Sequence, residues 1–109
     1  MPIVNQELWD KCIKNNQDPY GMCINEVAAE VMRLLDVEDE FDPHELIRRA
    51  DHDTGADGIT GFMAGAVAAT VAGVHSRGAE FRAKWNASYN VKDDQAGVVN
   101  PAIITIKGV

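Results

Sequence analysis

The sequence predicts an all-α protein: a small helical bundle of about four helices, the last of them long, followed by an extended apolar C-terminal arm. Two observations predict this class. Apolar residues recur at helical spacing as far as Tyr89. Residues 97–106 are then rich in β-branched residues and contain Pro101, so they cannot continue a helix. The 109 residues fit one helical domain, residues 1–92, with the arm over residues 93–109.

Local signals predict the first two helices. Asn5 is suited to cap a helix that reaches about Asn15. Pro19 suits the first turn of a second helix, which ends near Asp36. Both segments place their apolar residues on one face, so each is expected to pack against the rest of a bundle.

The third helix has the clearest start, because Asp42 can cap it and Pro43 can open it. It is expected to end near Ala50, before a loop of acidic residues over 51–57. A fourth helix is predicted from about residue 58 to residue 89, with a bend near Gly73 or Gly78.

A stripe of small residues lies along the predicted fourth helix. It comprises Gly61, Gly65, Ala69 and Gly73, which are four positions apart and therefore share one face. A partner helix can approach such a face closely. We expect the stripe to mediate self-association together with Val99, Ile103, Ile104 and Ile106 of the arm, giving a homo-oligomer. Packing of the second helix against the fourth within one chain is the alternative.

The negative charge is concentrated in an acidic segment, residues 36–57. The chain has a net charge of −7, and this segment holds nine acidic residues against Arg48 and Arg49, while the remainder is balanced. Direct nucleic-acid binding is therefore not expected, since it depends on Lys and Arg. The candidate partner surface is a run of carboxylates at the start of the segment: Asp36, Glu38, Asp39 and Glu40. A solvated loop would have the same composition.

The sequence favours a cytoplasmic location and no membrane insertion. The uncharged stretch 58–74 is shorter than the ~20 residues of a membrane span, and the N-terminus has no signal segment. Cys12 and Cys23 are accordingly expected to be buried thiols rather than a disulfide.

Two weaker constellations suggest chemistry. Arg77, Arg82 and Trp85 could bind a small anion or a nucleotide, although local pairs of Glu80 with Arg77 and Lys84 on a solvated face explain the same residues. His52, Asp53 and Asp57 are the candidate metal ligands, and a metal-dependent hydrolase would use them; acids that cap the following helix are the alternative. No nucleophile with a nearby base, no phosphate loop and no cofactor motif is present.

Four short motifs point to a family. They are Asp18-Pro19-Tyr20-Gly21; His52-Asp53 followed by Asp57-Gly58-Ile59-Thr60-Gly61-Phe62-Met63; Gly78-x-Glu80-Phe81-Arg82 with Asn86; and Gly97-Val98-Val99-Asn100-Pro101-Ala102. Together they resemble a group of small proteins encoded in tailed phages and prophages. The resemblance spans most of the chain. It implies that the protein is encoded by a phage or prophage, but it implies no particular activity.

We therefore expect a non-catalytic, phage-derived protein that self-associates and binds a host or phage protein, with the acidic segment as the partner surface. No cofactor is expected. The alternatives are an oligomeric binder of a small anionic ligand and the metal-dependent hydrolase described above.

Overall fold

Helices account for almost all of the described structure. The computed structural model describes residues 3–15, 19–56, 58–59 and 61–89. Within these residues the chain forms five helices and no strand: α1 (Gln6–Asn15), α2 (Pro19–Val37), α3 (Pro43–Thr54), α4 (Gly61–Val74) and α5 (Gly78–Tyr89). The predicted all-α class is confirmed, whereas the expected arm, residues 93–109, lies outside the described residues.

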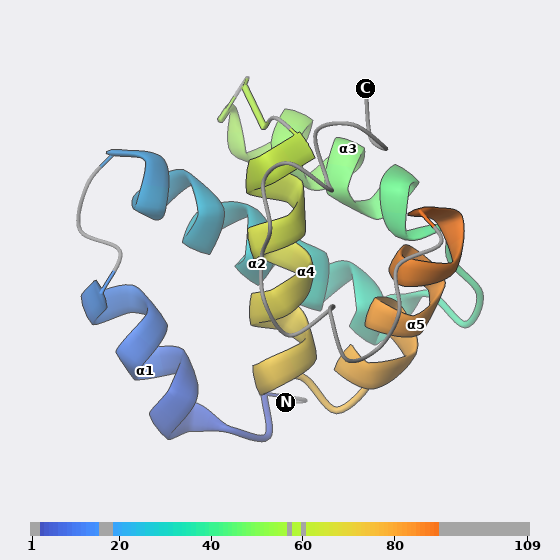
Figure 1. Cartoon of the computed structure of the whole chain (residues 1–109), viewed down its shortest axis with the longest axis horizontal. Coiled ribbons are helices and arrows are strands. Elements are labelled where there is room, and N and C mark those ends of the chain that lie inside the picture. Colours follow the sequence, from blue (N-terminus) through green and yellow to red (C-terminus); the bar gives the residue numbers. More distant parts are fainter. Residues whose placement is uncertain (1–2, 16–18, 57, 60, 90–109) are drawn as a thin grey trace.

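Helix α4 is the central element of the bundle. It packs against α1, α2 and α5, while α3 packs on α2 and α5, and Figure 1 shows α4 crossing in front of α2 with α1 and α5 on opposite sides. Its sequence explains this position, because a helix without charged residues on any face is stable only when other elements surround it.

The core is built from small and medium-sized aliphatic side chains together with two aromatic ones. Val27, Val31 and Leu35 of α2 are buried against Leu46 of α3 and Val67 of α4. Helix α5 adds buried aromatic rings. The fully buried side chains of greatest volume are Phe81, Met32, Leu35, Leu46, Val27, Val31, Val67, Val71 and Val74.

The starts predicted for the first three helices are confirmed, whereas the fourth begins at Gly61 and not near residue 58. The Leu8 amide donates to Asn5 Oδ1 at 3.0 Å, and the His44 amide donates to Asp42 Oδ1 at 3.0 Å. In both cases the side chain satisfies a backbone donor that has no partner inside the helix.

Helix α3 runs one turn beyond the expected end near Ala50. It continues to Thr54 and stops at Gly55, which has a φ of 71°. Glycine adopts this left-handed conformation without the steric cost that other residues incur. His52 and Asp53 consequently lie in the last turn of a helix, and the expected loop over these positions is wrong.

The prediction of one long fourth helix is also wrong, because the chain breaks after Val74. In a continuous helix the Val74 carbonyl would accept from Gly78. Instead it accepts from the amides of Val4, at 2.7 Å, and Asn5, at 3.3 Å, and the Gly78 amide donates to the His75 carbonyl at 3.0 Å. The N-terminal segment thus occupies the carbonyl that would have extended α4, and α5 starts in a new direction.

None of the described helices combines the length and apolar character needed to span a membrane. Cys12 and Cys23 are thiols, as expected, but both are partly exposed rather than fully buried.

Candidate functional site

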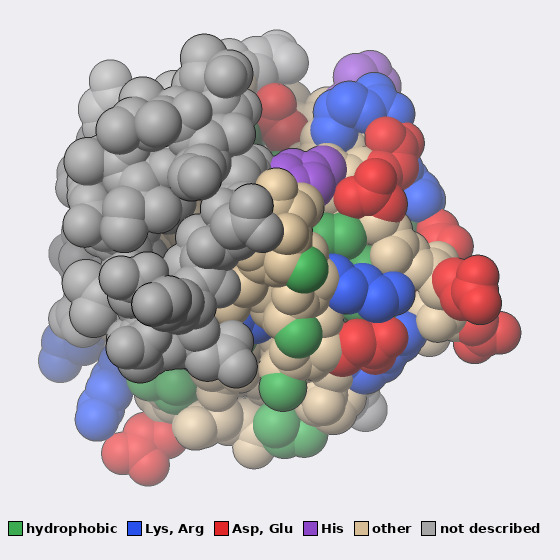
Figure 2. All heavy atoms as spheres, turned by 45° about the vertical axis from the view of Figure 1, so that its right-hand side comes forward, with side chains coloured by type: hydrophobic (Ala, Val, Ile, Leu, Met, Phe, Trp, Pro, Cys, Tyr) green, Lys and Arg blue, Asp and Glu red, His purple; other side chains and the backbone are tan. Residues whose placement is uncertain are grey.

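The four candidate carboxylates lie where α2 gives way to α3. Asp36 is in the last turn of α2, and the other three follow in the connection to α3. We refer to residues 37–40 as the acidic edge. On the face that Figure 2 shows, acidic side chains lie among Lys and Arg side chains, and hydrophobic side chains expose only small areas between them.

The structure separates these carboxylates into two kinds. Asp36 Oδ1 lies 2.8 Å from His75 Nε2, and Glu38 Oε1 accepts from Arg49 Nη1 at 2.7 Å. Asp39 and Glu40 are exposed, and no described residue forms an ion pair with either. The sequence grouped four equivalent acids, whereas only the last two point to solvent without a partner among the described residues.

His75 is a buried polar residue whose role the sequence did not predict. Its side chain is 0% exposed, and its Nδ1 accepts a hydrogen bond from the Arg77 amide at 3.0 Å. Because a backbone amide can only donate, Nδ1 carries no proton, and Nε2–H donates to Asp36. His75 therefore ties the turn between α4 and α5 to the end of α2.

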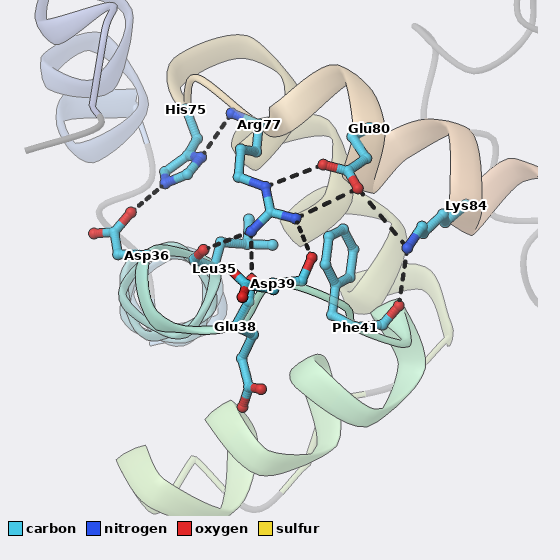
Figure 3. Close-up of polar contacts among 9 residues, drawn as sticks. All are labelled: Leu35, Asp36, Glu38, Asp39, Phe41, His75, Arg77, Glu80 and Lys84. Carbon is cyan, nitrogen blue, oxygen red and sulfur yellow. Dashed lines mark hydrogen bonds and ion pairs between the residues drawn. The ribbon is translucent and has the colours of Figure 1, made fainter.

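Arg77 makes the largest set of contacts at this junction (Figure 3). Its Nη1 donates to the carbonyls of Leu35, at 2.9 Å, and Glu38. Its Nη2 donates to the Asp39 carbonyl at 3.0 Å, and its Nε to Glu80 at 3.0 Å. The guanidinium group thus satisfies carbonyls at the C-terminal end of α2, where a positive charge is also favoured by the helix dipole.

Phe41 closes the same junction on its other side. The Arg77 guanidinium carbon lies 5.1 Å from the centre of its ring, and Lys84 Nζ lies 4.2 Å from it. Lys84 also donates to the Phe41 carbonyl at 3.3 Å, and the ring stacks on Phe81 with centroids 5.8 Å apart. The two cations and the aromatic stack fix the end of the connection against α5.

Charge pairs around the first turns of α5 match the local prediction. Glu80 pairs with Arg77 at 3.0 Å and with Lys84 at 3.8 Å. The hydrogen bond from Arg77 lowers the pKa of Glu80 below its ordinary value, and the positive charges of Arg77 and Lys84 act in the same direction. The local pairs are therefore present, but no pattern in the sequence predicts that Arg77 also reaches α2.

The three candidate ligand-binding residues do not form one open site. Arg77 is engaged by the carbonyls described above, and Trp85 is only 4% exposed, with its ring stacked on His44 at 4.8 Å between centroids. Arg82 lines a separate hollow of about 240 Å³ between α4 and α5, whose other described lining residues are Ala72, Ala79 and Ala83.

The candidate metal ligands are only partly described. His52 Nδ1 lies 3.4 Å from Asp53 Oδ1 on an exposed surface, and Asp57 lies outside the described residues. No group of three or more His, Cys, Asp or Glu residues able to hold a metal ion occurs in the described part of the chain.

A serine–histidine contact that the sequence did not predict lies between α3 and α5. His44 Nε2 is 2.7 Å from Ser88 Oγ, and that hydroxyl donates to the Trp85 carbonyl at 2.7 Å. Since the hydroxyl has one proton, it accepts from the imidazole instead of being activated by it. This pair stabilises the contact between two helices and does not have the arrangement of a nucleophile and its base.

The small-residue stripe is used within the chain at one end. A Cβ atom on Gly73 would lie 2.7 Å from Leu8 Cδ2, so α1 occupies this position. Gly65 is buried, and Gly61 and Ala69 are partly exposed. The stripe borders the core face of α4, because Ala68, which is buried in the core, lies only about 60° around the helix from Gly65. Val99, Ile103, Ile104 and Ile106 lie outside the described residues.

Comparison with known proteins identifies the family. A protein-family model described as "Type I Thoeris inhibitor Tad4" matches residues 1–108. No curated protein and no solved structure matches the chain. Tad4 is a phage anti-defence family, which agrees with the resemblance to phage-encoded proteins. Since the match covers almost the whole sequence, the chain belongs to the Tad4 family of type I Thoeris inhibitors.

Proposed function

We propose that this protein inhibits type I Thoeris defence without catalysis, by binding a protein of that system through its acidic segment and chiefly through the acidic edge. The family supplies the target system. The observation that carries the proposal is the exposure of Asp39 and Glu40 near Val37, on a connection whose backbone is held by the turn between α4 and α5.

The acidic edge has the chemistry of a protein-binding surface. Asp39 and Glu40, which have no ion-pair partner among the described residues, offer complementarity to a basic surface, which favours both association rate and choice of partner. Val37 is 68% exposed and lies two residues before Asp39. An apolar side chain next to unpaired charges can be covered by a partner, whereas in the free protein it remains in water.

A binding test should compare two double charge reversals. Asp39→Lys with Glu40→Lys changes the acidic edge, and Glu7→Lys with Asp10→Lys makes the same charge change on the exposed face of α1. We expect the first pair to lose inhibition of Thoeris in cells challenged with phage, and to lose binding to purified Thoeris proteins tested one at a time. The α1 pair should retain both.

Full inhibition by the Asp39/Glu40 variant would contradict the proposal. Equal losses in both variants would also contradict it, because they would mean that the total charge of the chain matters and the acidic edge does not.

Sequestration of a small anionic signal of the defence system is the second candidate function. It is supported by Arg82, whose guanidinium group has no described hydrogen-bond or ion-pair partner and lines the hollow between α4 and α5. One cation among three alanines offers few polar groups to fix an anion, which is why we rank it second. Calorimetry against a panel of nucleotides should detect binding that Arg82→Ala removes; equal binding by that variant would exclude Arg82 from such a site.

We also propose self-association through Gly61, Gly65 and Ala69 together with the C-terminal arm. The proposal is supported by the partial exposure of Gly61 and Ala69 on an uncharged helix. Light scattering should give a mass above the 11.9 kDa of one chain, and Ala69→Glu should reduce it to that of a monomer. A monomeric parent protein would refute the proposal.

A further inference from the structure

The connection from α2 to α3 is held at two points, by Arg77 in the turn before α5 and by Lys84 in α5. Arg77 binds the carbonyls of Leu35, Glu38 and Asp39. Lys84 binds the carbonyl of Phe41. All four acceptors are backbone oxygens, so these contacts restrain the conformation of the main chain directly.

Polar contacts bridge an open hollow at this place. A surface cavity of about 350 Å³ is lined by residues of both sides, including Glu38 and Asp39 from the connection and Ser76 and Arg77 from the turn. The guanidinium group reaches across it, and the hydrogen bond from His75 to Asp36 spans the same two segments. The position of the acidic edge at this hollow consequently depends on a few directed hydrogen bonds.

We infer that Arg77 is a positioning residue for partner binding: it holds residues 37–40 in one backbone conformation, so that Asp39, Glu40 and Val37 are presented together to a basic partner surface. This inference rests on the proposed function. A connection that is already ordered loses less conformational entropy on binding, and a competent conformation that is always populated is available at every encounter.

Arginine suits this role better than lysine. Its planar guanidinium group carries several N–H donors in fixed directions, and here they reach two carbonyls through Nη1, a third through Nη2, and Glu80 through Nε. A lysine ammonium is a single point charge on a flexible stem and cannot reproduce this set. Arg77→Lys therefore retains the positive charge but loses the set of directed hydrogen bonds.

The test compares Arg77→Lys with Arg33→Lys. Arg33 makes a two-point contact with Glu30 on the exposed face of α2, so it is a matched arginine without a link to the acidic edge. Hydrogen–deuterium exchange should be faster for the amides of residues 38–41 in Arg77→Lys and unchanged in the core of α4. Association with the purified Thoeris protein that the parent binds should slow by about tenfold, with dissociation less affected, because only a fraction of molecules is competent at any time.

Several outcomes would overturn the inference. One is unchanged exchange at residues 38–41; another is faster exchange with an unchanged association rate. A loss that appears only in the dissociation rate would also overturn it, since it would indicate a direct contact with the partner. Should Arg77→Lys lower the helix content, Lys84→Gln applies the same test at the Phe41 end of the connection.

The charge reversal at Asp39 and Glu40 distinguishes the two failures. Binding that survives this reversal refutes the proposed function. The positioning role alone is refuted if the charge reversal abolishes binding while Arg77→Lys and Lys84→Gln both associate at the parental rate.

Discussion

At the scale of single residues, a side chain at position 78 would collide with the backbone of α4. A Cβ atom there would lie 2.7 Å from Ala72 Cα and closer still to the Val71 carbonyl oxygen. Backbone atoms cannot move aside as the end of a flexible side chain can. Gly78 thus lets α5 start directly against the end of α4, which places Arg77 within reach of α2.

Gly78→Ala should lower the free energy of unfolding by about 1–3 kcal/mol, the usual cost of overpacking. Gly58→Ala is the control, because the nearest atom to its added Cβ, the Ala56 carbonyl oxygen, is 3.8 Å away. Urea unfolding followed by circular dichroism would measure both. Equal stabilities for the two variants would show that the chain accommodates the collision.

Glu80 gives a residue-scale prediction for pH. Its pKa is lowered in the folded protein by Arg77, so its contribution to stability is present above the ordinary pKa and is lost as pH falls through the lowered one. Glu80→Gln should therefore be less stable than the parent near neutral pH, and the difference should disappear in acid. Urea midpoints across this pH range would measure it, and a difference that persists in acid would assign the effect to packing.

At the scale of elements, the beginnings of helices could be predicted, whereas the glycines near the interior break predicted only a bend and not the end of α4. Asn5 and Asp42 act on amides two or three residues away, so the signal is local. The end of α4 depends on Val4, which donates to Val74 from 70 residues away in sequence. No local pattern contains such a partner, and the apolar spacing continues unbroken into α5.

The cap at Asp42 can be tested directly. Asp42→Ala should cost about 1 kcal/mol of stability, because the His44 amide loses its acceptor. Asp42→Ser keeps an acceptor at the same position and should retain most of the stability. Chemical unfolding of the three proteins would compare them, and an Asp42→Ser variant as unstable as Asp42→Ala would show that the charge, and not the cap, is responsible.

At the scale of the whole molecule, composition predicted where the charge is concentrated but not which carboxylates remain available. Asp36 is engaged by His75 and Glu38 by Arg49, and both partners come from other elements. Arg77 shows the same limit, since its pairing with Glu80 is local and its contacts with α2 are not. Which carboxylates are left without a partner depends on contacts made by the folded chain, so the sequence could predict only the acidic segment as a whole.

The net charge of −7 leads to a prediction about ionic strength. If a basic partner surface is bound, raising the salt concentration should reduce the association rate far more than it changes the dissociation rate, since added ions screen exposed charges beyond about 10 Å at 0.1 M. Surface plasmon resonance over a salt series would measure both rates for the parent and the Asp39/Glu40 charge reversal. A salt-independent association rate in the parent would contradict an electrostatic partner surface.

The backbone acceptors of Arg77 have a consequence for how such a protein can diversify. Because the guanidinium group binds main-chain oxygens at residues 35, 38 and 39, the contact does not depend on which side chains stand at positions 39 and 40. Residues at these two positions can be substituted while the backbone of the connection keeps its conformation. Recognition of a changing target can therefore be altered by point substitutions at these positions, without a change in the backbone conformation that Arg77 holds. Libraries randomised at positions 39 and 40 should yield folded proteins at high frequency.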